Sequence, residues 1–129
     1  MLLHEDLTNT IIKCFYKVYN ELGYGFLEKV YENAFALELQ NSGLACIKQC
    51  PIKVYYQHQQ VGNYFADLLV ENKIIIELKA GEGGIITEHE LQLTNYLKAT
   101  EYEIGLLFFF GEKPSFKRKL FTNDNKKIR

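Results

Sequence analysis

Three charged side chains stand inside two otherwise apolar segments near the middle of the chain. Asp67 lies within segment 64–70, and Glu77 and Lys79 interrupt segment 74–80. Both segments have the apolar, strand-forming composition expected of core strands. Because successive side chains of a strand point to opposite faces, Glu77 and Lys79 share a face and lie about 6.6 Å apart along the strand. Charges in such a position are candidates for a metal site or for catalysis.

Whether Asp67 joins that face depends on the turn between the two segments. A turn of odd length, Glu71-Asn72-Lys73, pairs the strands symmetrically about Asn72 and keeps Asp67 on the face of Glu77. A two-residue turn would direct it to the other face. The pairs of the odd register are Asp67–Glu77, Leu69–Ile75 and Phe65–Lys79. In this register the Cβ atoms of the two acids lie about 5 Å apart.

Two carboxylates that close repel each other, and a bound cation is a natural reason to keep them. Asp67, Glu77 and the backbone carbonyl of Leu78 together can hold Mg²⁺ or Mn²⁺. Such an ion lowers the pKa of a bound water and stabilises negative charge on a phosphoryl group. Lys79 would orient that water, help to deprotonate it or offset phosphate charge. The alternative is that both acids lie on a solvated face, with Lys79 as their salt-bridge partner.

Length and composition restrict the class of protein. The 129 residues suffice for one domain, which we place at residues 1–121, followed by a polar, basic and frayed tail at 122–129. A hydrophobic content of 47% excludes global disorder. The formal net charge of -1 provides no general attraction for nucleic acid, so any such contact must come from a local patch.

Cysteine usage and hydropathy indicate a cytoplasmic protein without a membrane partner. Cys14, Cys46 and Cys50 form no CxxC motif, and their odd number favours a reducing compartment. Cys46 and Cys50 could ligate a metal, but no second pair follows, so a structural role is favoured. No apolar run approaches the roughly 20 residues of a membrane span.

Hydrophobic periodicity predicts three helices and five strands in the order α-α-β-β-β-α-β-β. The helices are expected at 7–22, at 26–41 and from Thr87 to Ala99, and the strands at 44–56, 64–70, 74–80, 103–110 and 116–121. Residues 57–63 are read as a polar turn. The helical crossover should place strand 103–110 parallel to a preceding strand. The fold class is therefore α/β, with a mixed sheet of four or five strands flanked by helices.

Two details of these helices follow from residue spacing. The second helix should turn the stripe Leu27, Val30 or Tyr31, Ala34 and Leu37 inward. The third should begin with a capping box, in which Thr87 is the N-cap and Glu90 the third helical residue.

Four sequence blocks in order resemble the PD-(D/E)XK nuclease superfamily. Asp67, Glu77 and Lys79 have the D-(x9)-E-x-K pattern, after a helix that carries Glu28 and before a helix that carries Gln92. More closely, residues 25–31 match the pattern that names the GxxExxY family, and the blocks 64–80 and 89–98 resemble it as well. The resemblance extends over about residues 7–121. One departure is Ala66, which stands where the motif has proline before the aspartate.

The resemblance implies a restriction-endonuclease-like core with a metal held by Asp67 and Glu77. It also implies that Lys79 is the catalytic lysine, that Glu28 supports the site and that Gln92 lies near it. The residues themselves leave simpler interpretations open. Glu28 could only stabilise the first turn of its helix, Gln92 could be a polar flank, and Tyr31 could be a core aromatic.

The sequence thus predicts a Mg²⁺-dependent nuclease that hydrolyses phosphodiester bonds, with DNA favoured over RNA and a homodimer as one arrangement. The alternatives are a catalytically inactive domain that binds nucleic acid or protein and retains a relic site, and a homo-oligomeric scaffold. Basic residues are concentrated in one region near the C-terminal end of the sequence, which could contact phosphates or be a solvated tail. It comprises Lys113, Lys117, Arg118, Lys119, Lys126, Lys127 and Arg129, to which Lys48 and Lys53 could add.

Overall fold

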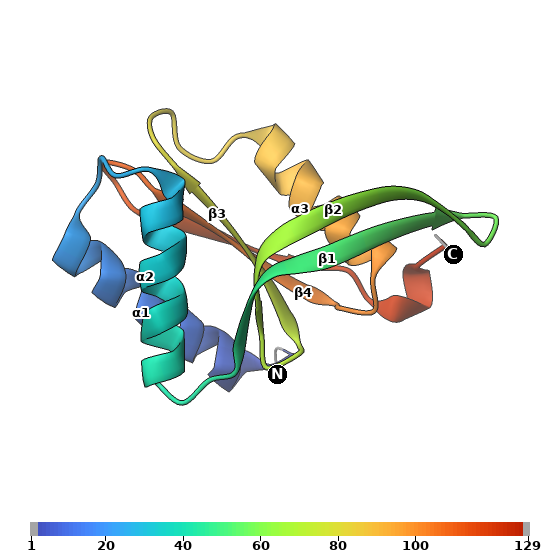
Figure 1. The fold of residues 1–129 in the computed structure, drawn as a ribbon, viewed down its shortest axis with the longest axis horizontal. Coiled ribbons are helices and arrows are strands. Elements are labelled where there is room, and N and C mark those ends of the chain that lie inside the picture. The colour runs from blue at the N-terminus through green and yellow to red at the C-terminus, as the bar shows by residue number, and fades with distance from the viewer. Residues whose placement is uncertain (1–2, 128–129) are drawn as a thin grey trace.

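The computed structural model describes residues 3–127 and shows three helices around one five-stranded mixed sheet (Figure 1). The helices are α1 (Glu5–Leu22), α2 (Glu28–Asn41) and α3 (Thr87–Ala99). The strands are β1 (Cys46–Tyr56), β2 (Gln59–Val70), β3 (Ile74–Ala80), β4 (Ile104–Phe110) and β5 (Ser115–Leu120), and a 3-10 turn follows at Asn123–Asn125. The predicted order of elements is confirmed. None of the described helices is both long and apolar enough to cross a membrane.

The sheet follows chain order, β1-β2-β3-β4-β5, and only β3 and β4 are parallel. That parallel pair confirms the crossover predicted through α3. Strands β2 and β3 pair as Leu68–Ile76, Leu69–Ile75 and Val70–Ile74, which is symmetric about Asn72. The odd-length turn is therefore confirmed, and residues 67 and 77 have the parity of one sheet face.

The two faces of the sheet carry separate cores. Under α1 and α2, Phe15 and Phe35 pack on Phe108 of β4, with ring centroids 4.6 and 5.1 Å away. Under α3, Leu93 packs against a second, smaller cluster. It approaches β4 at Gly105, where an added Cβ would lie 2.6 Å from the Leu93 side chain. The strand parity of residues 67, 77 and 79 places them on the α3 face.

The inward stripe predicted for α2 is right at Tyr31 and Ala34 but wrong at Leu27 and Leu37. Leu27 is 81% exposed and Leu37 58%, whereas Tyr31, Phe35 and Leu39 are fully buried. The helix carries apolar residues in two phases, and the phase with Tyr31 and Phe35 meets the aromatic core. Packing area decides between the two phases, because aromatic side chains bury the most surface.

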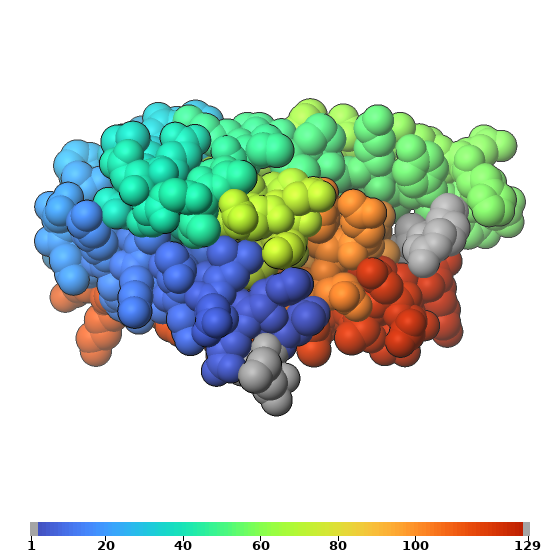
Figure 2. Space-filling model, turned by 90° about the horizontal axis from the view of Figure 1, so that it is seen from below, coloured from blue at the N-terminus to red at the C-terminus, as the bar shows by residue number. Residues whose placement is uncertain are grey.

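The polar turn predicted at 57–63 is also wrong. The turn is only Gln57-His58, both with positive φ (50° and 64°), and β2 already begins at Gln59. Positive φ at both central residues matches the twist of a tight hairpin. Residues 53–64 therefore form a projecting hairpin arm, which reaches one end of the molecule in both overall views (Figures 1 and 2).

The predicted capping box at α3 does not form. Ile86 precedes the helix and Thr87 is already helical. His89 at the third position accepts the Ile86 N–H on Nδ1 at 3.3 Å, while Glu90 pairs with Lys119 at 2.5 Å. Because the helix starts one residue early, a histidine takes the place expected for a glutamate.

The C-terminal segment is anchored as far as Lys126, so the expectation of a frayed tail is wrong up to that residue. Lys126 is only 8% exposed, and its Nζ donates to the carbonyls of Thr100 (2.7 Å) and Tyr102 (2.6 Å). Figure 2 shows this segment (red) on the same surface as α1 (blue). Residues 128–129 lie outside the described part of the chain.

Candidate active site

The strands β2 and β3 separate beyond the pair Leu68–Ile76, and carboxylates take over the backbone donors of β3. Asp67 Oδ2 accepts the N–H of Leu78 at 2.7 Å. Glu28, from the first residue of α2, accepts the N–H of Ala80 on Oε1 at 3.3 Å. The opening between β2 and β3 is therefore bridged at Leu78 by an acid of the neighbouring strand and at Ala80 by an acid from α2, which is distant in the chain.

Glu77 is the most unusual carboxyl group of this opening. Its residue is 4% exposed, and its Oε1 is buried without a hydrogen-bond partner. Burial raises the pKa of Glu77 to about 10, helped by the hydrogen bond and charge of Asp67, while Lys79 acts in the opposite direction. This carboxyl group therefore favours a bound proton or a bound cation, since either one would relieve its repulsion from Asp67.

Lys79 lies on the same strand and face as Glu77 but is not its salt-bridge partner. None of the ion pairs among residues 3–127 includes Lys79. Its charge still acts locally, because the pKa of His89 is lowered first by burial and then by Lys79. The salt-bridged, solvated arrangement that the sequence left open is thus not the one observed, and the ammonium group remains available to a ligand.

The segment with the GxxExxY pattern explains how Glu28 is placed. Gly25 adopts φ 109°, a left-handed conformation that favours glycine. Tyr31 is fully buried and stacks on Phe110 at 4.2 Å, which confirms the core interpretation. Its Oη also donates to the Gly23 carbonyl at 2.7 Å and accepts the Phe26 N–H at 3.2 Å. The tyrosine thereby fixes the loop that precedes Glu28.

Gln92 lies on α3 one helical turn before Tyr96, and its side chain acts to lower the pKa of the Tyr96 hydroxyl. Burial raises the pKa of Tyr96 to about 12, and the charges of Glu77 and Asp67 contribute to that shift. Within the described chain Gln92 makes no hydrogen bond to the carboxylates; it lies one helical turn from Tyr96, which is close enough for their charges to act on it.

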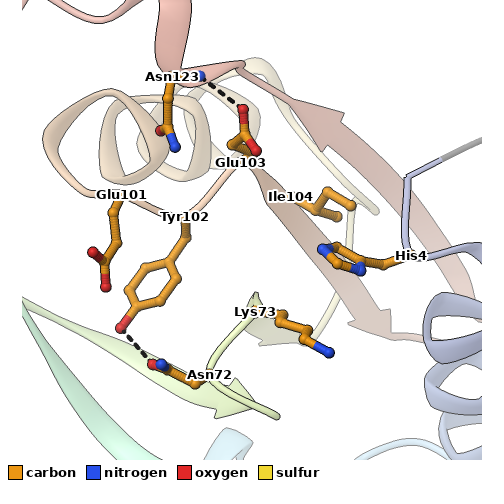
Figure 3. Close-up of a pocket in the computed structure, with 8 residues that line it drawn as sticks. All are labelled: His4, Asn72, Lys73, Glu101, Tyr102, Glu103, Ile104 and Asn123. Atoms are coloured by element: carbon orange, nitrogen blue, oxygen red, sulfur yellow. Dashed lines mark hydrogen bonds between the residues drawn. The ribbon is translucent and has the colours of Figure 1, made fainter.

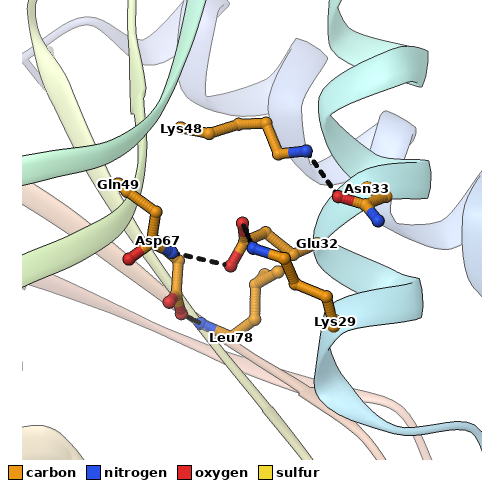
Figure 4. Close-up of polar contacts among 7 residues, drawn as sticks. All are labelled: Lys29, Glu32, Asn33, Lys48, Gln49, Asp67 and Leu78. Atoms are coloured by element: carbon orange, nitrogen blue, oxygen red, sulfur yellow. Dashed lines mark hydrogen bonds and ion pairs between the residues drawn. The ribbon is translucent and has the colours of Figure 1, made fainter.

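Sequence reasoning placed Glu32 on the same side of the helix as Glu28 but assigned no role to this acid, which is buried beside the opening. Glu32 is 5% exposed, pairs with Lys29 at 2.9 Å and accepts from Gln49 Nε2 at 3.0 Å (Figure 4). Gln49 lies across from Asp67 in β1 and has a φ of 55°, a strained value for a strand residue. The signal available was the spacing of Glu32, one helical turn after Glu28.

The basic residues do not form one surface. Lys117, Arg118 and Lys119 are consecutive in β5. The two lysines therefore point to one face of the sheet and Arg118 points to the other. Lys119 pairs with Glu90, and Arg118 donates to the Leu3 carbonyl at 3.1 Å. Lys126 is buried, Lys48 donates to Asn33, and Arg129 lies outside the described residues. The predicted basic concentration is therefore divided.

A cavity of about 250 Å³ lies at the other end of the parallel strands (Figure 3). Lys73, just before β3, and Ile104, the first residue of β4, line it together with His4. Tyr102 Oη donates to Asn72 Oδ1 there at 3.1 Å. Because Glu77 and Lys79 lie toward the opposite end of β3, this cavity is separate from the candidate site.

The donor set of the site suits a hard cation held partly by backbone and water. No group of three or more His, Cys, Asp or Glu side chains within residues 3–127 is arranged to hold a metal, and the three cysteines are free thiols. The opening instead offers two carboxylates, one with an unpartnered buried oxygen. Mg²⁺ is commonly bound by one or two carboxylates and retained waters, so the residues fit this ion.

Comparisons with known proteins identify the superfamily and the fold of the chain. The family model of the PD-(D/E)XK nuclease superfamily matches residues 5–119, so the chain belongs to that superfamily. Its mixed sheet with flanking helices is consistent with a restriction-endonuclease-like fold.

Among solved structures, the chain is similar in fold to the crystal structure of SSO0001, with a TM-score of 0.57 and 17% sequence identity. The alignment covers 73% of this chain and 50% of that one, so the chain spans about half the length of SSO0001. At this identity the likeness concerns the fold alone. The sequence matched no curated protein.

Proposed function

We propose that this protein is a Mg²⁺- or Mn²⁺-dependent nuclease that hydrolyses phosphodiester bonds, and that it belongs to the GxxExxY branch of its superfamily. The observation that carries the proposal is Glu77, whose buried Oε1 has no partner beside a second carboxylate. An arrangement that raises the pKa of a carboxyl group to about 10 is unfavourable for stability near neutral pH, so a ligand is the simplest reason for it.

Asp67 and Glu77 are proposed to hold the cation, with the Leu78 carbonyl as a backbone ligand. The N–H of Leu78 points to Asp67 across the opening. Because the N–H and C=O of one strand residue point to the same side, its carbonyl faces the opening too. When bound, the cation supplies an acidified water and neutralises phosphate charge.

The remaining residues act on the water and the substrate. Lys79 makes no ion pair within residues 3–127, so its ammonium group can orient the attacking water or offset charge on the phosphate. Glu28 accepts the Ala80 N–H and keeps the end of β3 in place beside Lys79. Gln92 is proposed to hold Tyr96 against the carboxylates and to contact substrate.

The first test is Mn²⁺ binding by calorimetry together with cleavage of single-stranded and duplex oligonucleotides. Wild type should bind in the micromolar-to-millimolar range, and Asp67→Ala combined with Glu77→Ala should abolish binding. Lys79→Ala should keep binding and lose about 10²–10⁴-fold in cleavage rate. Glu101→Gln, an exposed acid outside the site, is the matched control and should behave as wild type.

Absence of Mn²⁺ binding even with an oligonucleotide present would contradict the proposal. It would favour the inactive domain with a relic site.

DNA as the substrate and a homodimer as the working form are also proposed. Residues 3–127 form one sheet with its flanking helices and include no separate recognition unit, so sequence-specific cutting by this domain is proposed to use a second copy or another protein. Sizing of the pure protein at working concentration tests the dimer, and a monomer there would contradict it.

A further inference from the structure

A groove of about 660 Å³ runs between the hairpin arm and α3, next to the carboxylates. The arm contributes Val61 and Tyr64, and the helix contributes Leu91, Gln92, Asn95 and Tyr96. Figure 1 shows the β1–β2 ribbon continuing past the body of the sheet, on the side where α3 lies. The groove exists only because the arm is a long, tightly turned hairpin.

Apolar and aromatic surface is left exposed along this groove. Tyr64 is 51% exposed, Val61 64% and Leu91 56%, so the core accounts for little of their surface. The ring of Tyr64 lies 5.8 Å from that of Tyr96, at an angle of 39°. Exposed tyrosines of this kind offer flat faces on which nucleic-acid bases stack.

The polar side chains of the groove suit the edges of bases. Gln92 and Asn95 project from one side of α3, three residues apart, and both line the groove. An amide side chain donates and accepts at once, as the edges of bases do. Tyr96 lines the same groove and lies close enough to Asp67 and Glu77 for their charges to act on it, so this surface adjoins the carboxylates.

The charge of the groove argues against a duplex. Glu88 is the one charged side chain among its lining residues. A duplex presents its phosphates outward and needs cations on the protein surface. A groove with aromatic faces and without cations offers stacking rather than phosphate contacts, so it suits bases that are already unpaired, with the phosphates outside the groove.

We propose that this groove stacks unpaired bases of the strand to be cut, so that the substrate is single-stranded nucleic acid or a single-stranded stretch. This inference rests on the proposed function, because it assigns the substrate class of the same site. Stacking beside the carboxylates would hold the strand while its backbone crosses the opening between β2 and β3.

The test measures binding of fluorescent oligothymidylate, oligouridylate and a duplex by anisotropy in EDTA. Tyr64→Ala should weaken single-strand binding by about tenfold or more, since a stacked base contributes about 1–3 kcal/mol. Tyr64→Phe keeps the ring and should bind as wild type. Tyr56→Ala is the matched control: it removes a 65% exposed tyrosine of the same arm that does not line the groove.

The two single-stranded probes distinguish DNA from RNA, and tighter binding of either one supports the inference. Absence of single-strand binding, tighter binding of the duplex, or equal loss in Tyr64→Ala and Tyr56→Ala would overturn it. The measurement needs no cleavage. Binding that depends on Tyr64, without any cleavage in Mn²⁺, would contradict the proposed nuclease function but still support the groove as a binding site for single strands.

Discussion

The face of the sheet under α1 and α2 and the face under α3 differ in how completely their helices cover them. On the first face two helices close over a continuous aromatic core that includes Phe15, Phe35 and Phe108. On the second a single helix covers a smaller cluster around Leu93, and the groove and the carboxylates lie beside it. The same strands serve both faces, because their side chains alternate.

The difference shows how a small domain stays folded although its candidate site lowers its stability. Burial of a carboxyl group without a partner is unfavourable, as the raised pKa of Glu77 reflects. The closed face supplies the apolar burial that offsets it. Stability and chemistry are thus assigned to opposite faces, and each assignment can be tested by substitutions that should affect only one of them.

The largest effect is expected from the closed face. Phe35→Ala removes a fully buried ring that lies 5.1 Å from Phe108, and should lower the free energy of unfolding by about 3–5 kcal/mol. Leu91→Ala, on the open face, should change it by less than about 0.5 kcal/mol because Leu91 is 56% exposed. Urea denaturation of both variants measures the contrast, and similar losses would contradict the division between the faces.

A gradual effect, small at each pH step and spread over several pH units, should appear as a pH dependence of the metal-free protein. The folded state keeps a proton on Glu77 up to a pKa of about 10, whereas the unfolded chain releases it near the ordinary pKa of 4.5. Between these values the folded state binds more protons, so the free energy of unfolding falls as pH rises, by at most about 1.4 kcal/mol per pH unit. Below pH 4.5 this penalty is absent.

Denaturation in EDTA from pH 5 to about pH 9 measures that slope. Glu77→Gln cannot ionise and should flatten it, becoming more stable than wild type at the alkaline end. Equal slopes for the two proteins would show that Glu77 does not hold the proton. Saturating Mn²⁺ should raise the stability of wild type and leave Glu77→Gln nearly unchanged.

The smallest effect concerns the loop before α2. Tyr31→Phe keeps the stack on Phe110 but removes the hydroxyl that joins the Gly23 carbonyl and the Phe26 N–H. It should lower the free energy of unfolding by about 1–2 kcal/mol and weaken Mn²⁺ binding, since Glu28 loses its fixed position. Tyr24→Phe, at a 59% exposed position, is the control. An unchanged Mn²⁺ affinity would show that this loop does not contribute to metal binding.

Predictions from residue patterns were reliable where a pattern is compatible with a single low-energy structure. The odd turn at Asn72 follows from the alternation of the strands on either side, and the structure has that register. Such predictions failed where two outcomes compete. The apolar residues of α2 permit two inward phases, and only the aromatic core around Phe108 selects the one with Phe35. The polar run after Tyr56 permits either a loop or a hairpin arm.

By itself, then, the sequence determined the order of the elements, the parallel crossover and the shared face of Glu77 and Lys79; Asp67 joins that face because the turn has the odd length seen in the structure. These depend on periodicity and turn length, which are local properties. Tertiary structure alone decided that β2 and β3 part beyond Ile76, that Glu28 reaches the Ala80 N–H, and that the arm and α3 enclose a groove. Those features join segments far apart in the chain, so they depend on packing rather than on local pattern.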